Sequence, residues 1–395
     1  MTFAGSRAMQ GMAGRFLGAL MLCLFFADIA AAGVLQLHAS EEISFEDNIY
    51  LTPEGEKASL ITTPKIGAEY FGRVPESSIV GDLHATAGYH LYSYKTEQNS
   101  YPDVLLHTHF KNDFFEFGDR YLYSSDSASQ EITERAKRYK NLVFFSLRTD
   151  PRNSIGFVVR AQNTTDYYTS TPFKFLKRFN RNCISLYGLM YYNFSPLTNV
   201  FLEYGHHERK YYIAKDNNSK GTSFALGMEG FISPVIEAKA KVSYAFRDYR
   251  FKVPSAINFV NTLGFYFAVD WKPRSKNEVR IMAQRYLEET VYGENRFFTA
   301  FDTSVYMLHK FTEKYYVSLQ FGYHVLDYAK VIDGVQRYDK LYSIRPEIGY
   351  EFKDWLLAGV WYRHTKRNST LYVADYLDRT ICLYINIRTR PKKPR

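Results

Sequence analysis

The chain has 395 residues, a mean hydropathy of −0.33 and a formal net charge of +9. This hydropathy excludes a polytopic helical membrane protein, which needs repeated apolar runs of about 20 residues. The basic surplus is spread along the chain, with no dense block before the last few residues, and this argues against a nucleic-acid-binding protein.

The first segment, residues 1–32, is typical of a secretory signal peptide. It combines Arg7 and Arg15 with an apolar run at residues 16–27 and three alanines at residues 30–32 that suit cleavage. The apolar run is too short for a membrane anchor, and Asp28 interrupts it. The sequence therefore predicts an exported chain. That chain keeps two cysteines, which we expect to be free thiols rather than a disulfide framework.

The exported chain alternates apolar and polar residues with a period of two, which is the spacing of β-strands. In chain order the clearest segments are residues 236–246, 257–271, 315–327 and 377–388. They are about twice as long as the usual globular strand of about 5 or 6 residues. Long strands with one apolar face, one polar face and aromatic ends indicate a transmembrane β-barrel. Only a closed sheet satisfies its backbone groups in lipid.

The connections between these segments alternate in length, which supports an up-and-down antiparallel barrel. Short turns are predicted at residues 73–78, 111–113, 150–153, 194–198, 232–234, 272–276, 311–313 and 352–354. Longer connections are predicted at residues 95–101, 124–139, 164–179, 210–220, 249–256, 288–296, 330–340 and 368–375. Barrels of the outer membrane have short periplasmic turns and long outer loops.

The strand count and the domain boundaries follow from this alternation. Eight short-turn hairpins, a first strand at residues 43–50 and a last strand at residues 376–388 predict an all-β barrel of 18 strands with both termini in the periplasm. The count becomes 16 if residues 43–50 stay outside the barrel. The predicted order is a signal peptide (1–32), a periplasmic segment (33–42), the barrel (43–388) and a basic tail (389–395).

If the apolar face meets lipid, many charged side chains face the lumen. The basic candidates are Arg148, Arg160, Arg209, Lys239, Lys241, Arg247, Arg280, Arg345, Arg363 and Arg367. Acidic residues on the same face include Glu116, Glu203, Glu229, Glu237, Asp270, Asp302, Glu347 and Asp378. One hypothesis is a network of charges that fills and stiffens the lumen. The other is a path for an anionic solute, because basic rings favour anions.

Arg285 is an exception, because it falls on the lipid face together with Ile281 and Leu287. At the middle of the membrane an arginine there would cost roughly 2–4 kcal/mol. We expect either a bulge or a position near the outer headgroups to relieve this cost.

No catalytic or metal-binding motif emerges from the sequence. In His206-His207-Glu208, neighbouring residues would point to opposite faces of a strand, and His107 and His109 are expected to fill polar space in the lumen. The chain has no CxxC motif and no glycine-rich phosphate loop. We therefore expect no enzymatic activity, no metal and no cofactor.

Two motifs near the ends of the mature chain resemble a known family. Near the start, Ser44-Phe45-Glu46-Asp47-Asn48-Ile49-Tyr50 precedes Leu60-Ile61-Thr62-Thr63-Pro64-Lys65-Ile66-Gly67. Near the end are Trp361-Tyr362-Arg363, Arg367-Asn368-Ser369, Asp375-Tyr376 and a last amphipathic strand. This pattern resembles the putative β-barrel porin 2 family. The resemblance implies an outer-membrane barrel associated with exopolysaccharide biosynthesis and export, and it carries over no catalytic residues.

These observations lead to three functional hypotheses for a protein of the outer membrane of a Gram-negative bacterium. The first is a passive porin-like conduit in exopolysaccharide secretion. The second is a plugged barrel with a structural or adhesive role, and the third is a barrel enzyme. The expected partners are outer-membrane lipid and lipopolysaccharide, an anionic polysaccharide or small anionic solute, and polysaccharide-export proteins, but no nucleic acid.

Overall fold

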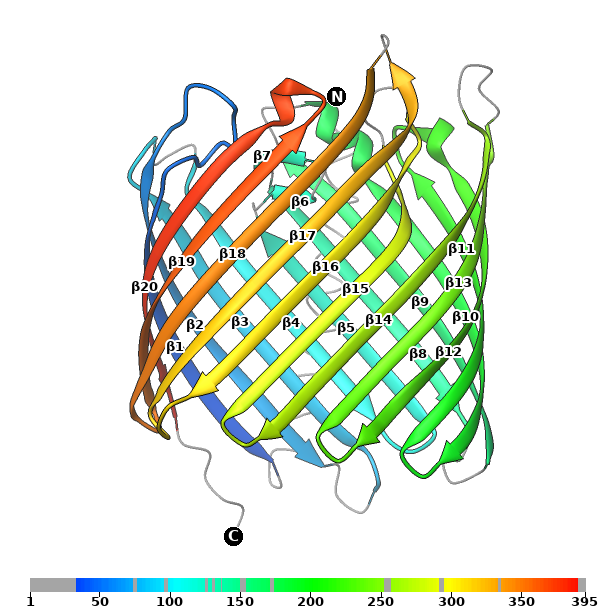
Figure 1. Cartoon of the computed structure of the whole chain (residues 1–395), viewed down its shortest axis with the longest axis horizontal. Coiled ribbons are helices and arrows are strands. Elements are labelled where there is room, and N and C mark those ends of the chain that lie inside the picture. The colour runs from blue at the N-terminus through cyan, green and yellow to red at the C-terminus, as the bar shows by residue number, and fades with distance from the viewer. Residues whose placement is uncertain are drawn as a thin grey trace, which may run out of the picture.

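The protein is a single closed β-barrel (Figure 1). The computed structural model describes residues 33–73, 77–95, 99–124, 127–129, 132–135, 137–149, 154–170, 174–251, 257–290, 295–332 and 335–389. Across these residues an 18-stranded antiparallel sheet closes on itself, because β1 pairs with both β2 and β20. The predicted fold and the count of 18 are confirmed, and the alternative of 16 is wrong. The predicted signal peptide and residues 390–395 lie outside the described residues.

The strands of the barrel wall run up and down in chain order. They are β1 (Val34–Glu46), β2 (Ser59–Arg73), β3 (Val80–Tyr92), β4 (Tyr101–Lys111), β5 (Phe115–Ser124), β8 (Lys137–Arg148), β9 (Ile155–Ser170), β10 (Arg181–Ser195), β11 (Thr198–Tyr211), β12 (Ser219–Ser233), β13 (Ile236–Tyr249), β14 (Phe259–Arg274), β15 (Asn277–Glu289), β16 (Phe297–Lys310), β17 (Tyr315–Ile332), β18 (Val335–Lys353), β19 (Leu356–Ser369) and β20 (Tyr376–Arg388). The connections hold a small hairpin, β6 (Ser127–Ser129) and β7 (Ile132–Arg135), and three 3-10 helices, η2 (Lys174–Phe179), η3 (Lys215–Asn217) and η4 (Tyr372–Ala374).

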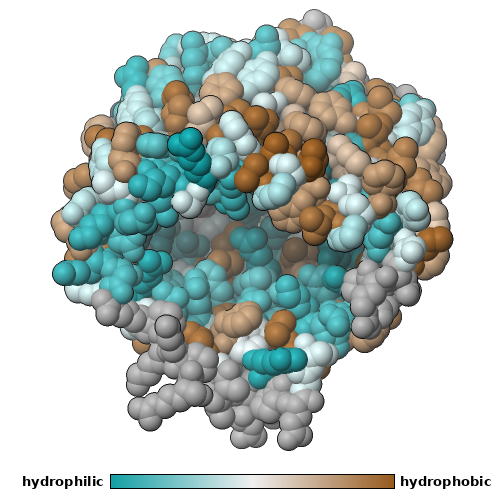
Figure 2. Space-filling model, turned by 60° about the horizontal axis from the view of Figure 1, so that its bottom comes forward, coloured by the Kyte–Doolittle hydropathy of each residue, from teal (hydrophilic) through white to brown (hydrophobic). Residues whose placement is uncertain are grey.

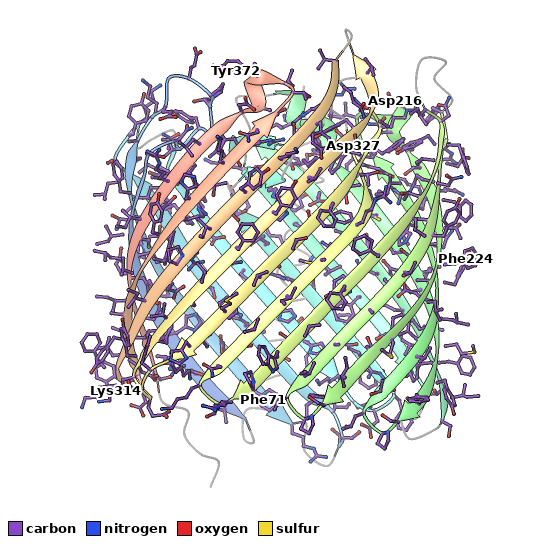
Figure 3. All side chains as sticks on the ribbon, in the orientation of Figure 1. Phe71, Asp216, Phe224, Lys314, Asp327 and Tyr372 are labelled. Carbon is purple, nitrogen blue, oxygen red and sulfur yellow. The ribbon has the colours of Figure 1, made fainter. Side chains whose placement is uncertain are left out.

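The short turns all lie at one end of the barrel. Lys314 and Phe71 mark this end in Figure 3, and Asp216 and Tyr372 mark the opposite end. The wall begins with β1 and finishes with β20 at the short-turn end. Because outer-membrane barrels carry short turns on the periplasmic side, we assign the short-turn end to the periplasm and the other end to the outside.

The first strand begins earlier than the sequence predicts. Residues 33–42, expected as a periplasmic segment, are almost entirely part of β1, whereas residues 47–50 follow the strand. Leu35 and Leu37 lie on the same exposed face as Ile43, and Glu41 interrupts this apolar face. Pairing with β2 and β20 on both sides keeps the segment extended in spite of this carboxylate.

Three of the predicted long connections are partly strand. β9 continues to Ser170, residues 124–139 include the β6–β7 hairpin, and β17 stays paired with β18 as far as Ile332 and Val335. These regions are too polar for lipid, and for that reason the alternation pattern predicts loops there. Outside the membrane, cross-strand backbone hydrogen bonds need no apolar face, so the strands continue past the rim.

Along most of the barrel wall, side chains alternate between the outer face and the lumen. On β20, Ile381, Leu383 and Ile385 are 49–60% exposed, while Cys382 between them is 1% exposed. Cys183 and Cys382 are both free thiols, as predicted. No helix in the described part of the chain is long and apolar enough to cross a membrane.

Candidate functional site

The candidate site is the lumen. Figure 2 shows a central hollow at the short-turn end of the barrel, and the residues visible inside it are mainly hydrophilic. The lumen is lined by the face of each strand that lies opposite to the exposed apolar side chains. This polar hollow, lined by protein side chains, is therefore the feature from which a function has to be argued.

At the end of the barrel opposite to the short turns, β15 and β16 leave the barrel wall and fold inward. The pairing of β14 with β15 stops at Phe265 and Arg285, although β14 stays paired with β13 up to Phe259 and β15 with β16 up to Glu289. We call residues 287–290 and 295–298 the inward hairpin. Its separation from β14 frees it to cross onto the inner face of other strands.

Burial of side chains that would otherwise face lipid shows where the inward hairpin goes. Leu287, Glu289 and Phe297 fall on the lipid-facing alternation of β15 and β16, yet their exposures are 9%, 3% and 6%. Leu287 and Phe297 pack with Tyr249, whose position in β13 faces the lumen. The hairpin therefore lies against the inner face of the wall, at the outer end of the lumen.

A balanced cluster of charges holds the inward hairpin to strands β10–β13. Arg209 donates to the carboxylates of Glu288 at 3.2 Å and Glu289 at 3.3 Å. Arg247 pairs with Glu289, and Arg181 lies 3.4 Å from Glu288. Ser219 and Tyr211 also donate to Glu289, and Asp166 lies 3.4 Å from Arg181. Three arginines face three carboxylates, so the cluster carries no net charge.

Backbone and amide contacts add to this attachment. The Asn217 side chain donates to the carbonyl of Thr290 at 3.0 Å, and the Tyr249 hydroxyl donates to the carbonyl of Arg296 at 3.2 Å. The Arg296 guanidinium donates to Asn258 Oδ1 and to the carbonyl of Phe251, both at 2.9 Å. Burial lowers the pKa of Arg296, but a guanidinium stays charged at neutral pH. The hairpin is thus fixed at both of its ends.

The ten basic residues singled out in the sequence all lie on the lumen face, and each has a carboxylate partner. The pairs not yet described are Arg148–Glu116 at 3.2 Å, Arg160–Glu116 at 3.0 Å, Lys239–Glu229, Lys241–Glu203 at 3.1 Å, Arg280–Asp270 at 3.2 Å, Arg345–Glu347 at 3.2 Å, Arg363–Asp378 at 3.4 Å and Arg367–Asp339. The structure does not bring them together as one basic surface. They are spread around the wall beside carboxylates, and two of them, Arg148 and Arg160, share Glu116.

Arg209 and Arg247 were predicted as lumen residues, but other residues that anchor the inward hairpin were not. Glu288 and Glu289 were placed in an outer connection, and Arg181 was not singled out. The signal for them is weak, since it consists of two adjacent carboxylates at the end of an alternating segment. Nothing in such a pattern states whether a connection folds outward or into the lumen.

The histidines form polar contacts within the lumen. His109 lies 3.1 Å from Asp82 and 3.0 Å from Glu116, and His107 stacks on it with ring centres 6.2 Å apart. In the motif His206-His207-Glu208, His207 contacts Ser185 at 3.0 Å. Among the residues that the structure describes, no group of three or more His, Cys, Asp or Glu side chains has a metal-binding arrangement.

Arg285 lies where the β14–β15 ladder ends. Its guanidinium donates to Thr262 Oγ1 at 3.0 Å and to the carbonyl of Leu263. The expected bulge is absent from the β14–β15 register at this residue. The arginine instead satisfies a carbonyl on β14 beyond the last β14–β15 pair, and this contact offsets the cost of a cation on the lipid side.

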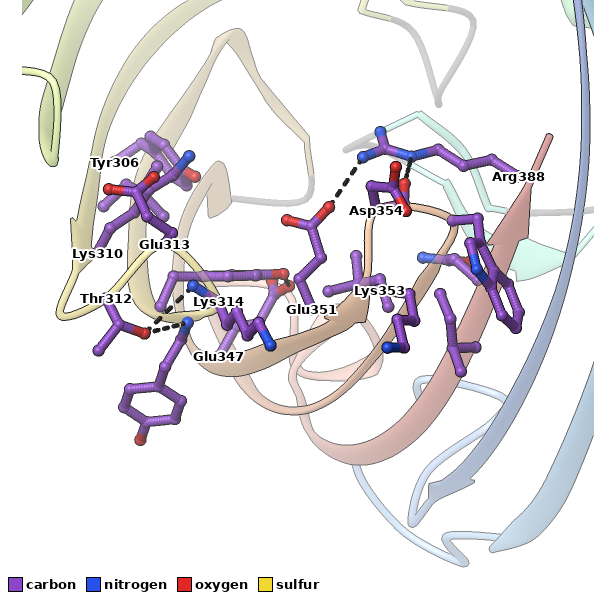
Figure 4. A pocket seen from close by; sticks show the side chains of 17 residues that line it. Tyr306, Lys310, Thr312, Glu313, Lys314, Glu347, Glu351, Lys353, Asp354 and Arg388 are labelled. Atoms are coloured by element: carbon purple, nitrogen blue, oxygen red, sulfur yellow. Dashed lines mark hydrogen bonds and ion pairs between the residues drawn. The ribbon is translucent and has the colours of Figure 1, made fainter. Parts of the chain in front are cut away.

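A cavity of about 410 Å³ opens at the periplasmic rim (Figure 4). In it, Glu347 accepts hydrogen bonds from Tyr316 at 3.0 Å and Tyr384 at 2.7 Å, and Glu351 pairs with Arg388 at 3.2 Å. Lys310, Lys314 and Lys353 also line this cavity. The rim at the short-turn end therefore presents hydrogen-bonding, cationic and anionic groups around this cavity.

Comparison with known proteins gives a family and a fold. The family model "Putative beta-barrel porin 2" matches residues 153–389. OccAB2 of Acinetobacter baumannii is 11% identical over 91% of this chain and 98% of its own, with a TM-score of 0.50. OpdK of Pseudomonas aeruginosa is 9% identical over 90% and 99%, with a TM-score of 0.51. OccK2 of Pseudomonas aeruginosa, in complex with glucuronate, is 7% identical over 91% and 98%, with a TM-score of 0.52. No curated protein matches the sequence.

Proposed function

This chain belongs to the putative beta-barrel porin 2 family, and we propose that it is a passive outer-membrane conduit for sugar polymers in exopolysaccharide secretion. The porin-like barrel is the fold of outer-membrane channels. The cargo is the proposed part. It rests on what the resemblance to this family implies, and the chemistry of the lumen supports it.

The observation that carries the proposal is the pairing of charge around the lumen. A wall in which each of the ten basic candidates has a carboxylate partner creates a weaker net field than a wall of one sign. Pores that select small ions by charge use rings of charged side chains of one sign. A sugar polymer instead exchanges many weak hydrogen bonds with polar groups as it moves, and a paired polar wall provides those without a strong ionic trap.

The inward hairpin gives this conduit a narrowing at its outer end. Its anchors lie on β10–β13, on one side of the barrel, through Arg209 and Arg247. In this proposal the hairpin limits the flow of small solutes while no polymer is present. Periplasmic export proteins deliver the polymer at the opposite end, near the cavity that contains Lys314.

A plugged structural barrel is the second candidate, because the same hairpin covers part of the outer mouth. The two candidates differ in what happens when the hairpin is released. A conduit gains permeability, whereas a plugged barrel with further obstruction gains none. OccK2, a protein of this fold, has a crystal structure in complex with glucuronate, which is an acidic sugar.

Deletion of the gene in its own host tests the proposed cargo. We expect the deletion strain to lose surface polysaccharide and to retain polymer in the periplasm. Complementation with the wild type restores export, and complementation with an unrelated 18-stranded porin does not. Unchanged amounts of extracellular polysaccharide in the deletion strain would contradict the proposal.

A further inference from the structure

Three basic side chains gather on the lipid-facing side of the last three strands, near the outer rim. They are Lys340 on β18, Lys366 on β19 and Arg379 on β20, with His364 between them. Lys366 and Arg379 are exposed, and the residues on either side of each are buried or half-buried. We call these four residues the outer basic patch.

The register of the strands brings the patch together. His364 lies directly opposite Arg379. Lys366 lies opposite Leu377, two residues from Arg379, and opposite Tyr342, two residues from Lys340. Diagonal neighbours of this kind are about 7–8 Å apart, which is within reach of one another's long side chains. One anionic group can therefore contact more than one of these cations.

The two lysines of the patch contrast with the lumen cations because they lack an ion-pair partner among the described residues. Each of the ten basic lumen candidates has a carboxylate partner. Within the described residues, Lys340 and Lys366 have no carboxylate at ion-pair distance, and Lys340 instead lies 5.4 Å from the Tyr338 ring. Arg379 has Asp47 at 3.8 Å. Unpaired cations on a lipid-facing wall are tolerated near the headgroups but not at the membrane centre.

The apolar side chains below the patch fix its height. On β18 the outward residues from Tyr342 to Phe352 are predominantly apolar. At about 3.3 Å per residue and a tilt of about 40°, this span is roughly 25 Å tall, which is the height of the apolar band of such barrels. Lys340 is the next outward residue above this span, so the patch lies at the level of the outer headgroups.

We propose that the outer basic patch is a binding site for the phosphate groups of the lipid A part of lipopolysaccharide. The cationic side chains bind the phosphate groups through charge-assisted hydrogen bonds. The acyl chains lie along the outward face below, where Ile381 and Leu383 are 50% and 60% exposed. The site lies outside the lumen and does not depend on what the lumen carries.

The test is binding of purified lipid A to the folded barrel in a neutral detergent, followed by thermal unfolding at several lipid concentrations. We expect doubly phosphorylated lipid A to stabilise the wild type. The double variant Lys340→Gln with Lys366→Gln should bind it about tenfold more weakly. Dephosphorylated lipid A should stabilise neither protein, and added salt should weaken the effect.

Lys220→Gln is the matched control. Lys220 is an exposed, outward lysine at the same rim, but Glu208 and Asp248 lie opposite it on the two neighbouring strands. This variant should bind lipid A as the wild type does. Binding by the double variant within twofold of the wild type would overturn the proposal. Equal stabilisation by phosphatidylglycerol would also overturn it, because the patch would then bind any anionic lipid and would not be specific for lipid A. If the double variant does not fold, Lys366→Gln alone is held to the same criteria.

Discussion

The carboxylate of Glu289 pairs with the guanidinium of Arg247, although strand alternation places Glu289 on the lipid side and Arg247 on the lumen side. The two meet because β15 leaves β14 above Arg285 and its end crosses the inner face of the wall. This one ion pair therefore reports on the inward fold of the β15–β16 hairpin.

Breaking that pair should destabilise the barrel. Glu289→Gln removes the carboxylate that Arg247 and Arg209 share, which leaves the buried Arg247 without it and the half-buried Arg209 with Glu288 alone. We expect the free energy of unfolding to fall by about 3–5 kcal/mol, the usual cost of removing one partner of a buried pair.

Urea unfolding in lipid vesicles measures this change. The double variant Glu289→Gln with Arg247→Gln should recover part of the loss, and Glu237→Gln, at an exposed lumen carboxylate, should change stability by less than about 0.5 kcal/mol. If Glu289→Gln behaves like Glu237→Gln, the hairpin is not held in this way.

Arg285 allows two opposing effects to be compared. Arg285→Met leaves the Leu263 carbonyl without this donor, at a cost of about 1–3 kcal/mol. The same change also removes a cation from the lipid side, which near the interface gains only about 0–1 kcal/mol. We therefore expect a net loss of stability in vesicles. A more stable variant would mean that the gain from removing the cation from the lipid side exceeds the loss of the hydrogen bond.

Ion selectivity should respond to the balance of a pair rather than to single cations. Lys241 lies 3.1 Å from Glu203. Lys241→Gln should shift preference toward cations by roughly twofold at low salt, because it exposes Glu203, and the shift should fade at high salt. Reversal potentials in planar bilayers measure this.

The reciprocal variants provide the control for selectivity. Glu203→Gln should shift preference toward anions, and the double variant should return to the wild-type value. A double variant that keeps the full shift of Lys241→Gln would show that Lys241 acts alone as part of an anion path.

The orientation of the barrel can be tested with single cysteines in a background with Cys183→Ser and Cys382→Ala. Val373 is 66% exposed at the loop end, and Lys314 lies in a turn at the opposite end (Figure 3). On intact cells, a membrane-impermeant maleimide should label Val373→Cys and not Lys314→Cys. The reverse pattern would mean that the assigned orientation is wrong.

The wall of the barrel could be predicted from the sequence because each strand has one face in lipid. That requirement imposes a period of two, as on β20, where Ile381 and Leu383 face outward and Cys382 between them is buried. The pattern is harder to follow where a charge such as Glu41 lies on the apolar face, and there the first strand begins earlier than its alternation predicts.

The inward hairpin could not be predicted in the same way. Its position depends on where the β14–β15 ladder ends and on contacts between Glu289 and strands far away in the chain. Periodicity assigned the ten basic residues to the lumen face. Their partners, such as Glu203 for Lys241, depend on cross-strand register, which alternation alone does not give.

Single-channel recording in planar bilayers tests the central claim most directly. The wild type should conduct, and sugar oligomers added on the periplasmic side should block the current reversibly. Glu289→Ala, which removes the carboxylate that holds the inward hairpin to Arg209 and Arg247, should conduct more than the wild type, whereas Glu237→Ala should not. Absence of conductance in both the wild type and Glu289→Ala would contradict the claim that this barrel is a conduit.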